Sequence, residues 1–271
     1  MSATQLSFCS ISALDRPLAA VAALAAAQGL DGIEATARPP HVDPGAGIGA
    51  ARAAGRSIRA AGVEVVAYGS YLGRDGQLGD ERARQEAALA VALGAPLLRV
   101  WAEPISGAPE DGFGDVVAML RAACDAAAGD GVTVVVERHL GSFADTPERV
   151  ERLLAAVDRA NFALNYQVLD ALPQRLAGAQ PDDARRLVPH ARYFHLKNYR
   201  PAEDGTGPMP PGASLRDGVL DYRAILAGAF DAGYTGPLTI EFLSFAPKPI
   251  EEKLADDLAF LRGVLRELGR A

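Results

Sequence analysis

The sequence predicts an α/β protein with the (β/α)8 architecture of a TIM barrel, as a single domain over residues 1–271. Eight short runs typical of β-strands alternate with eight longer patterns typical of helices. The length of 271 residues suits one such barrel. Polar side chains recur near the C-terminal ends of the later strand runs, which is where the active sites of TIM barrels lie.

The predicted strands are short runs rich in aliphatic and β-branched residues. They comprise residues 5–11, 32–36, 63–70, 96–101, 132–139, 162–167, 192–197 and 237–242. Successive side chains of a strand point to opposite faces, so an apolar set at every second position should pack against the helices. Val132, Val134 and Val136 form such a set, which turns Glu137 toward the barrel interior.

The predicted helices follow the strands and have recognisable ends. They comprise residues 15–29, 46–61, 80–93, 114–129, 147–159, 182–189, 221–232 and 250–268. Thr146 and Pro147 give one helix a cap and a first residue, and many helical patterns end at glycine. A doubly wound sheet is the alternative, but no Gly-rich phosphate loop follows the first strand. The longest irregular stretch, residues 198–218, is predicted to be a functional lid or edge.

The composition limits the classes of partner. A net charge of −7 argues against a nucleic-acid partner. Two cysteines, Cys9 and Cys124, are too few for a disulfide framework, and no signal sequence or membrane-spanning segment is recognised. We therefore expect a soluble cytoplasmic protein with a small-molecule substrate and no membrane partner.

Strand alternation turns four polar side chains inward at the C-terminal ends of four successive strands. These are Glu137, Gln167, His195 and Glu241. Two carboxylates and an imidazole in a partly apolar cavity would repel each other and lose hydration, and a divalent cation would relieve both effects. The ligand types suit Mn²⁺, Mg²⁺, Co²⁺ or Zn²⁺, so one divalent ion of undecided identity is predicted. The structural alternative is that the glutamates pair with Arg99 or Lys197.

Three motifs resemble those of the xylose isomerase-like TIM barrels, the sugar-phosphate isomerase and epimerase group that also contains endonuclease IV-type enzymes. "VVVERH" is similar to the family's strand-five glutamate motif, and "YFHLKN" to its strand-seven motif. "GVLDYRAILAGAFDAGYTGPLTIEF" is similar to the closing motif that ends in glutamate. The three motifs stand in the expected order, and together they are specific for the superfamily rather than for a substrate.

The resemblance implies that Glu137, His195, Glu241 and a residue of the sixth strand hold the metal ion. Relatives usually have aspartate at that position, where this sequence has Gln167. Its carbonyl oxygen can still be a ligand, but without charge, so Gln167 could equally bind substrate or support a ligand. Two further departures are Asp170, which matches a histidine of the family, and Asn198, which replaces an aspartate.

The resemblance also implies a reaction: isomerisation or epimerisation of a sugar, keto-sugar, inosose or hydroxy-ketone through an enediolate. Glu137 and Glu241 would exchange the proton alpha to the carbonyl, and Lys197 would stabilise the oxyanion. The expected substrate contacts are His139, Glu34, Trp101, Asn165 and Arg216.

Three alternatives to this function stay open. A lyase or dehydratase would use the same first step, and a non-catalytic sugar-binding barrel would have lost the metal through Gln167. An abasic-site endonuclease is disfavoured, because its multi-zinc cluster predicts extra histidines from the second, third and sixth strands. This chain has four histidines in total and none in its third strand, and its acidic charge also disfavours DNA. Since many relatives assemble as dimers or tetramers, a homo-oligomer is the alternative to a monomer.

Overall fold

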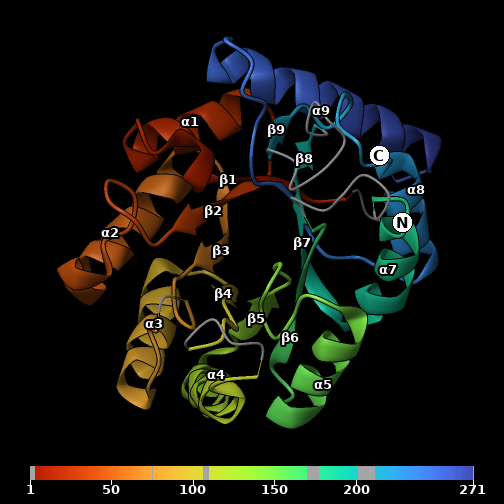
Figure 1. The fold of residues 1–271 in the computed structure, drawn as a ribbon. Coiled ribbons are helices and arrows are strands. Elements are labelled where there is room, and N and C mark those ends of the chain that lie inside the picture. Colours follow the sequence, from red (N-terminus) through yellow and green to blue (C-terminus); the bar gives the residue numbers. More distant parts are fainter. Residues whose placement is uncertain (1–3, 75, 106–109, 170–176, 201–210, 271) are drawn as a thin grey trace.

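The strands of the computed structural model form a closed parallel barrel, which confirms the predicted fold class (Figure 1). The structure describes residues 4–74, 76–105, 110–169, 177–200 and 211–270. The strands are β1 (Leu6–Cys9), β2 (Gly32–Thr36), β3 (Glu64–Gly69), β4 (Leu97–Val100), β5 (Thr133–Glu137), β6 (Phe162–Gln167), β7 (Ala191–Leu196) and β10 (Leu238–Ile240). Each pairs with its sequence neighbour in the barrel, and β10 pairs with β1 to close it.

Helices surround the barrel and cover its outer face (Figure 1). They are α1 (Leu18–Ala27), α2 (Gly47–Ala60), α3 (Asp80–Leu93), α4 (Phe113–Ala127), α5 (Pro147–Val157), α7 (Gln180–Leu187), α8 (Tyr222–Asp231) and α9 (Ile250–Glu267). All eight predicted helices are present, and their ends differ from the prediction by three residues or fewer. The largest difference is at the first helix, because Pro17 is the N-cap and α1 begins only at Leu18.

Side-chain alternation divides the buried residues into two layers. Val134, Leu164 and Phe194 belong to the large core between the strands and the helices, as predicted from their spacing. A small second cluster fills the barrel interior and contains Val66, Ala67, Val135, Ala163 and Tyr193. Val135 and Tyr193 stand two positions before Glu137 and His195, so this cluster lies beneath the polar residues of the barrel top.

The stretch after β7 is less irregular than the sequence predicts. Its described parts include an antiparallel pair, β8 (Asn198–Tyr199) and β9 (Pro211–Ala213). Asn198 is buried and braces the segment, because its Nδ2 donates to the carbonyls of Leu215 (2.9 Å) and Leu220 (3.2 Å). Its Oδ1 accepts from the backbone N–H groups of Tyr199 and Leu220.

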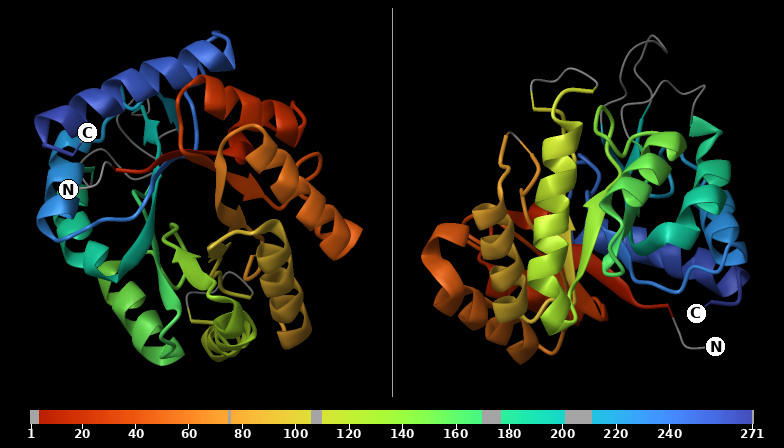
Figure 2. Two further views of the ribbon diagram at one scale, coloured as in Figure 1. Left: turned by 180° about the vertical axis from the view of Figure 1, so that it is seen from behind. Right: turned by 90° about the horizontal axis from the view of Figure 1, so that it is seen from below.

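The two ends of the described chain lie side by side (Figure 2). The hydroxyl of Thr4 donates to the carbonyl of Arg270 at 3.0 Å. Among the helices that the structure describes, none has both the length and the apolar character needed to cross a bilayer.

Candidate metal centre

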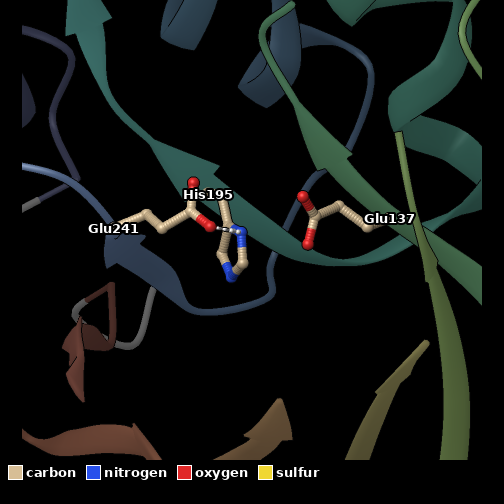
Figure 3. Close-up of side chains that lie close together, drawn as sticks. All are labelled: Glu137, His195 and Glu241. Atoms are coloured by element: carbon tan, nitrogen blue, oxygen red, sulfur yellow. Dashed lines mark ion pairs between the residues drawn. The ribbon is translucent and has the colours of Figure 1, made fainter. Parts of the chain in front are cut away.

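Three side chains from three strand ends converge at the top of the barrel (Figure 3). Glu137 is the last residue of β5, His195 lies near the end of β7, and Glu241 directly follows β10. One potential ligand atom of each lies within 4.8 Å of the others, and all three side chains are buried. Figure 3 shows the two carboxylates pointing toward each other from either side of the imidazole. This arrangement can hold a divalent cation between two carboxylates and an imidazole nitrogen.

The imidazole of His195 is oriented by a buried carboxylate. Its Nε2 lies 2.6 Å from Glu34 Oε2, on the side away from the cluster. Glu34 also accepts hydrogen bonds from the hydroxyl of Tyr193 (2.8 Å) and from Arg99 (3.1 Å). Nδ1 of His195 therefore faces the cluster, 3.6 Å from Glu241 Oε1. A carboxylate behind a histidine in this way fixes the ring and its tautomer for metal binding.

Charge compensation sets the protonation of this cluster. Burial alone would raise the pKa of Glu34, but the charges of His195 and Arg99 hold its pKa below the ordinary value. Burial would lower the pKa of His195, but Glu34 and Glu241 raise that pKa above its ordinary value. Burial raises the pKa of Glu137, against the opposing effect of Arg99 and with a further increase from Glu241. The buried carboxylates thus require positive charge beside them, which is the property that suits them to a cation.

Gln167 lies inside the cluster rather than at its edge. It is fully buried, and its Nε2 donates to Glu137 Oε1 (3.0 Å) and to the carbonyl of Arg138 (3.3 Å). Its carbonyl Oε1 lies 3.2 Å from Nδ1 of His195. The amide oxygen and the imidazole nitrogen thus stand next to each other, so both can face one ion. The set of oxygens and one nitrogen fits a divalent metal ion.

The ion pairs predicted as an alternative to a metal site are present as well. Arg99 Nε lies 3.2 Å from Glu137 Oε2, while Lys197 Nζ lies 3.3 Å from Glu241 Oε2. Both basic side chains are almost fully buried. Each glutamate of the cluster therefore has one cationic partner and keeps a second oxygen toward the centre, so the pairs and the cluster coexist.

The residues that are expected to contact the substrate lie at different places relative to the cluster. Asn165 is next to the cluster, with Nδ2 at 3.2 Å from His195 Nδ1. Glu34 is fully buried behind His195. Trp101 is 5% exposed, its Nε1 donates to Ser70, and the guanidinium of Arg74 lies 4.0 Å from its ring centroid. That Glu34 and Trp101 contact the substrate stays a prediction. Their buried positions do not favour it.

Two further residues of the prediction have contacts with aromatic rings. The ring of the half-buried His139 packs edge-on against Trp101, with centroids 4.9 Å apart. Arg216 is exposed and its guanidinium lies 5.8 Å from the ring centroid of Phe260 on α9, at a separate cavity. Asp170 lies outside the described residues. The structure therefore groups Asn165, Gln167 and Lys197 with the potential ligands, but not Arg216.

Sequence reasoning missed two supports of the site. The hydroxyl of Tyr193 holds Glu34, and its position two residues before His195 was the available signal. Gly69 makes room for the Glu34–Arg99 pair, because a Cβ atom at this position would collide with Glu34 Oε1 and lie 2.8 Å from the Arg99 guanidinium. Nothing in the local pattern around Gly69 indicates that role.

Comparisons with known proteins agree with this fold. The sequence matches the family described as "Xylose isomerase-like TIM barrel" over residues 22–264. A search of curated proteins gives no significant match.

Solved structures extend the likeness to the whole chain. A xylose isomerase-like TIM barrel protein from Mycobacterium smegmatis, in complex with magnesium, has a TM-score of 0.72 and 17% identity over 100% of this chain and 98% of its own. D-allulose 3-epimerase from Methylomonas sp. has a TM-score of 0.72 and 18% identity over 98% and 99%. The probable 3-DHS dehydratase AsbF from Bacillus anthracis has a TM-score of 0.69 and 20% identity over 95% and 98%. At these identities the likeness shows the shared fold.

Proposed function

Because the chain belongs to the xylose isomerase-like TIM barrel family, we propose that it is a divalent-metal-dependent isomerase or epimerase. Its substrate would be a sugar, keto-sugar, inosose or small hydroxy-ketone. The observation that carries the proposal is the buried cluster of Glu137, His195 and Glu241, with potential ligand atoms within 4.8 Å of one another. The structural likeness to D-allulose 3-epimerase supports this reaction class.

Glu137, His195 and Glu241 would hold the metal ion, with the carbonyl oxygen of Gln167 as a fourth ligand. The bound ion would stabilise negative charge on the carbonyl oxygen of the substrate. Glu34 keeps Nδ1 of His195 turned toward the centre, so the ring is oriented before an ion binds.

The two glutamates would carry the proton. A carboxylate oxygen of Glu137 removes the proton alpha to the carbonyl, and the electron pair of the broken C–H bond forms the enediolate. Glu241 faces the centre from the other side and returns a proton to the neighbouring carbon or to the opposite face (Figure 3). Arg99 counters the burial that raises the pKa of Glu137, which helps to keep this base ionised. Lys197, beside Glu241, would stabilise the developing oxyanion.

A dehydratase is the second candidate, favoured by the structural likeness to the probable 3-DHS dehydratase. It would begin with the same proton removal by Glu137. The electron pair of the C–H bond would then form a C=C bond, while the beta hydroxyl takes a proton from Glu241 and leaves as water. The two functions differ in the fate of the substrate and share the buried cluster.

Metal content tests the proposal first. Wild type and Glu241→Ala are treated with a chelator, reloaded with Mn²⁺, Co²⁺, Zn²⁺ or Mg²⁺, and measured by plasma mass spectrometry. We expect about one equivalent in wild type, as one cluster implies, and its loss in the variant. A wild type that holds no metal under any loading would contradict the proposal and favour a sugar-binding barrel without catalysis.

Turnover tests the role of Glu241. Exchange of substrate protons with deuterated water is measured on ketoses and keto-glycosides. Glu241→Gln should lower the rate by about 10²- to 10⁴-fold, because the amide cannot exchange the proton, while the fold stays intact. Glu267→Gln, an exposed change on α9, is the matched control. A folded Glu241→Gln variant with full activity would refute the acid/base assignment.

A further inference from the structure

A cavity of about 730 Å³ lies apart from the candidate metal centre. Its walls come from the segments that follow β7 and β10 and from the first half of α9. The lining includes Arg200, Ser214, Arg216, Phe245, Lys248 and Lys253. None of the three potential metal ligands lines it. Because its walls follow the C-terminal ends of β7 and β10, it opens at the same end of the barrel as His195 and Glu241.

The charge of this cavity is opposite to that of the whole protein. The chain has 27 basic and 34 acidic residues, with a net charge of −7. The cavity is lined by four basic side chains, Arg200, Arg216, Lys248 and Lys253, and by two acidic ones, Asp217 and Asp256. A concentration of positive charge in a concave site of an acidic protein attracts anions.

The two acidic residues are already engaged. Asp256 pairs with Lys248 at 2.9 Å, and Asp217 accepts a hydrogen bond from the hydroxyl of Ser214 at 2.7 Å. Within the part of the chain that the structure describes, Arg200, Arg216 and Lys253 form no ion pair. Among the described lining residues, three cations thus stand against one carboxylate without an ion pair, Asp217, so the lining keeps a net positive charge that can interact with an anionic ligand.

The start of α9 brings Lys253 to the cavity, together with two carboxylates of the same turn, Glu251, which pairs with Arg16, and Glu252. Lys253 lies in the first turn of this 18-residue helix, which begins at Ile250. The N-terminal N–H groups of a helix carry partial positive charge, so a lysine in the first turn is locally unfavourable. A bound anion would interact favourably with this lysine, while Glu251 and Glu252 already interact with the helix end.

The cavity wall is held by backbone geometry. Gly212 has a φ of +106°, and a Cβ atom at this position would meet the ring of Phe245 at 2.6 Å. The N–H of Phe245 donates to the carbonyl of Gly212 at 2.8 Å, which ties the loop after β10 to β9. The site is thus built from two segments that fit only with glycine at position 212.

We propose that this cavity binds the anionic group, phosphate or carboxylate, of the sugar-like substrate, an assignment that rests on the proposed function. The same two strands carry both sites. β7 bears His195 and leads to Arg200, while β10 leads to Glu241 and then to the wall that contains Phe245 and Lys248. The proposal places the reacting carbon of an extended substrate at the glutamates and its charged end among Arg200, Arg216 and Lys253.

Calorimetric titration with inorganic phosphate and with acetate, at constant ionic strength in chloride, tests the cavity. The test variant is Arg216→Gln with Lys253→Gln. The matched control is Arg52→Gln with Arg56→Gln, which removes the same charge from exposed positions on α2. We expect wild type and the control to bind one of the anions, and the test variant to bind it at least tenfold more weakly. Circular dichroism checks folding, and Arg216→Gln alone replaces the double variant if that variant unfolds.

Each outcome decides the inference. Tighter binding of phosphate indicates a phosphorylated sugar, while tighter binding of acetate indicates a sugar acid. Binding of neither anion by wild type, or equal weakening in the test and control variants, overturns the proposal. Mn²⁺ titration separates this failure from that of the proposed function. If wild type binds an anion but no Mn²⁺, the anion site in the cavity is supported. The metal-dependent reaction, and the assignment of the anion to its substrate, would then be overturned.

Discussion

Single side chains decide the balance of charge in the candidate metal centre. The motif resemblance predicts that Gln167 replaces an aspartate of the family, and its amide does two things that a carboxylate cannot do together. Its N–H group donates to Glu137, and its carbonyl oxygen lies beside His195. The amide thus reduces the negative charge of the cluster without removing an oxygen ligand. The expected result is a site that is stable without metal and that binds a divalent ion less tightly.

Gln167→Asp tests this balance. The added charge should tighten Mn²⁺ binding by about tenfold or more, which corresponds to about 1.4 kcal/mol. The metal-free variant should be less stable than wild type, because Glu137 loses its N–H donor and gains a like charge. Mn²⁺ titration and thermal unfolding measure the two effects.

Gln167→Leu is the matched variant, since it removes the oxygen without adding charge. It should weaken Mn²⁺ binding. Equal Mn²⁺ affinity in wild type and both variants would show that position 167 does not contact the ion.

Whole elements rather than single residues position the cavity proposed to bind an anion. The loops after β7 and β10 line the cavity, and two buried polar side chains fix the segment after β7. Asn198 braces the segment up to Leu220, while Asp257 of α9 accepts a hydrogen bond from the N–H of Leu215 at 2.7 Å. These bonds connect the barrel strand, the loop and the last helix.

Asn198→Asp should loosen this segment. Aspartate cannot donate to the carbonyls of Leu215 and Leu220, and its charge would be buried. We expect the free energy of unfolding to fall by about 1–3 kcal/mol, measured by urea denaturation. The exposed change Gln85→Glu, which introduces the same chemistry on α3, should leave it nearly unchanged. Equal stability of both variants would contradict the bracing role.

The stability of the α9 contact should depend on pH. Burial raises the pKa of Asp257 to about 7, with further raising by the charges of Asp256 and Asp217, against the lowering effect of the Leu215 N–H. The folded state therefore binds a proton that the unfolded state releases near pH 4, so this contribution to stability is present at low pH and is lost as the pH rises to about 7.

Asp257→Asn should remove this dependence. Above pH 7 the variant should be more stable than wild type, because no charge is buried, and the difference should shrink toward pH 4. Thermal unfolding between pH 4 and 8 measures it, with the exposed Asp231→Asn as control. A constant difference across that range would contradict the assignment to Asp257.

At the scale of the whole molecule, barrel closure brings the potential ligands together. The pairing of β10 with β1 and β7 fixes where Glu241 stands relative to His195. Metal binding should therefore stabilise the entire barrel, since an unfolded chain has no such site. The homo-oligomer and the cytoplasmic location stay predictions.

Thermal unfolding with Mn²⁺ measures this coupling. At a free Mn²⁺ concentration of about 100 times the dissociation constant, the free energy of unfolding should rise by about 2.7 kcal/mol. For a domain of this size the midpoint should rise by about 5–10 °C. A chelator should reverse the rise, and Glu241→Ala should show none. An equal rise in Glu241→Ala would place the ion elsewhere.

The sequence by itself determined the barrel and the direction of its side chains. Alternation of apolar residues is a local property, so the outward set of Val134, Leu164 and Phe194 and the inward set of Glu137, His195 and Glu241 could be predicted from single strands. The order of the strands followed from the alternation with helices.

Only the tertiary structure decided which of these side chains touch. Glu34 and His195 are 161 positions apart, and their contact depends on the stagger of strands around the closed barrel. The sharing of Arg99 between Glu34 and Glu137, and the position of Arg216 over α9, depend on the same geometry. Local periodicity specifies the face of a strand, whereas ion pairs and cavities require the distances between elements that lie far apart in the chain.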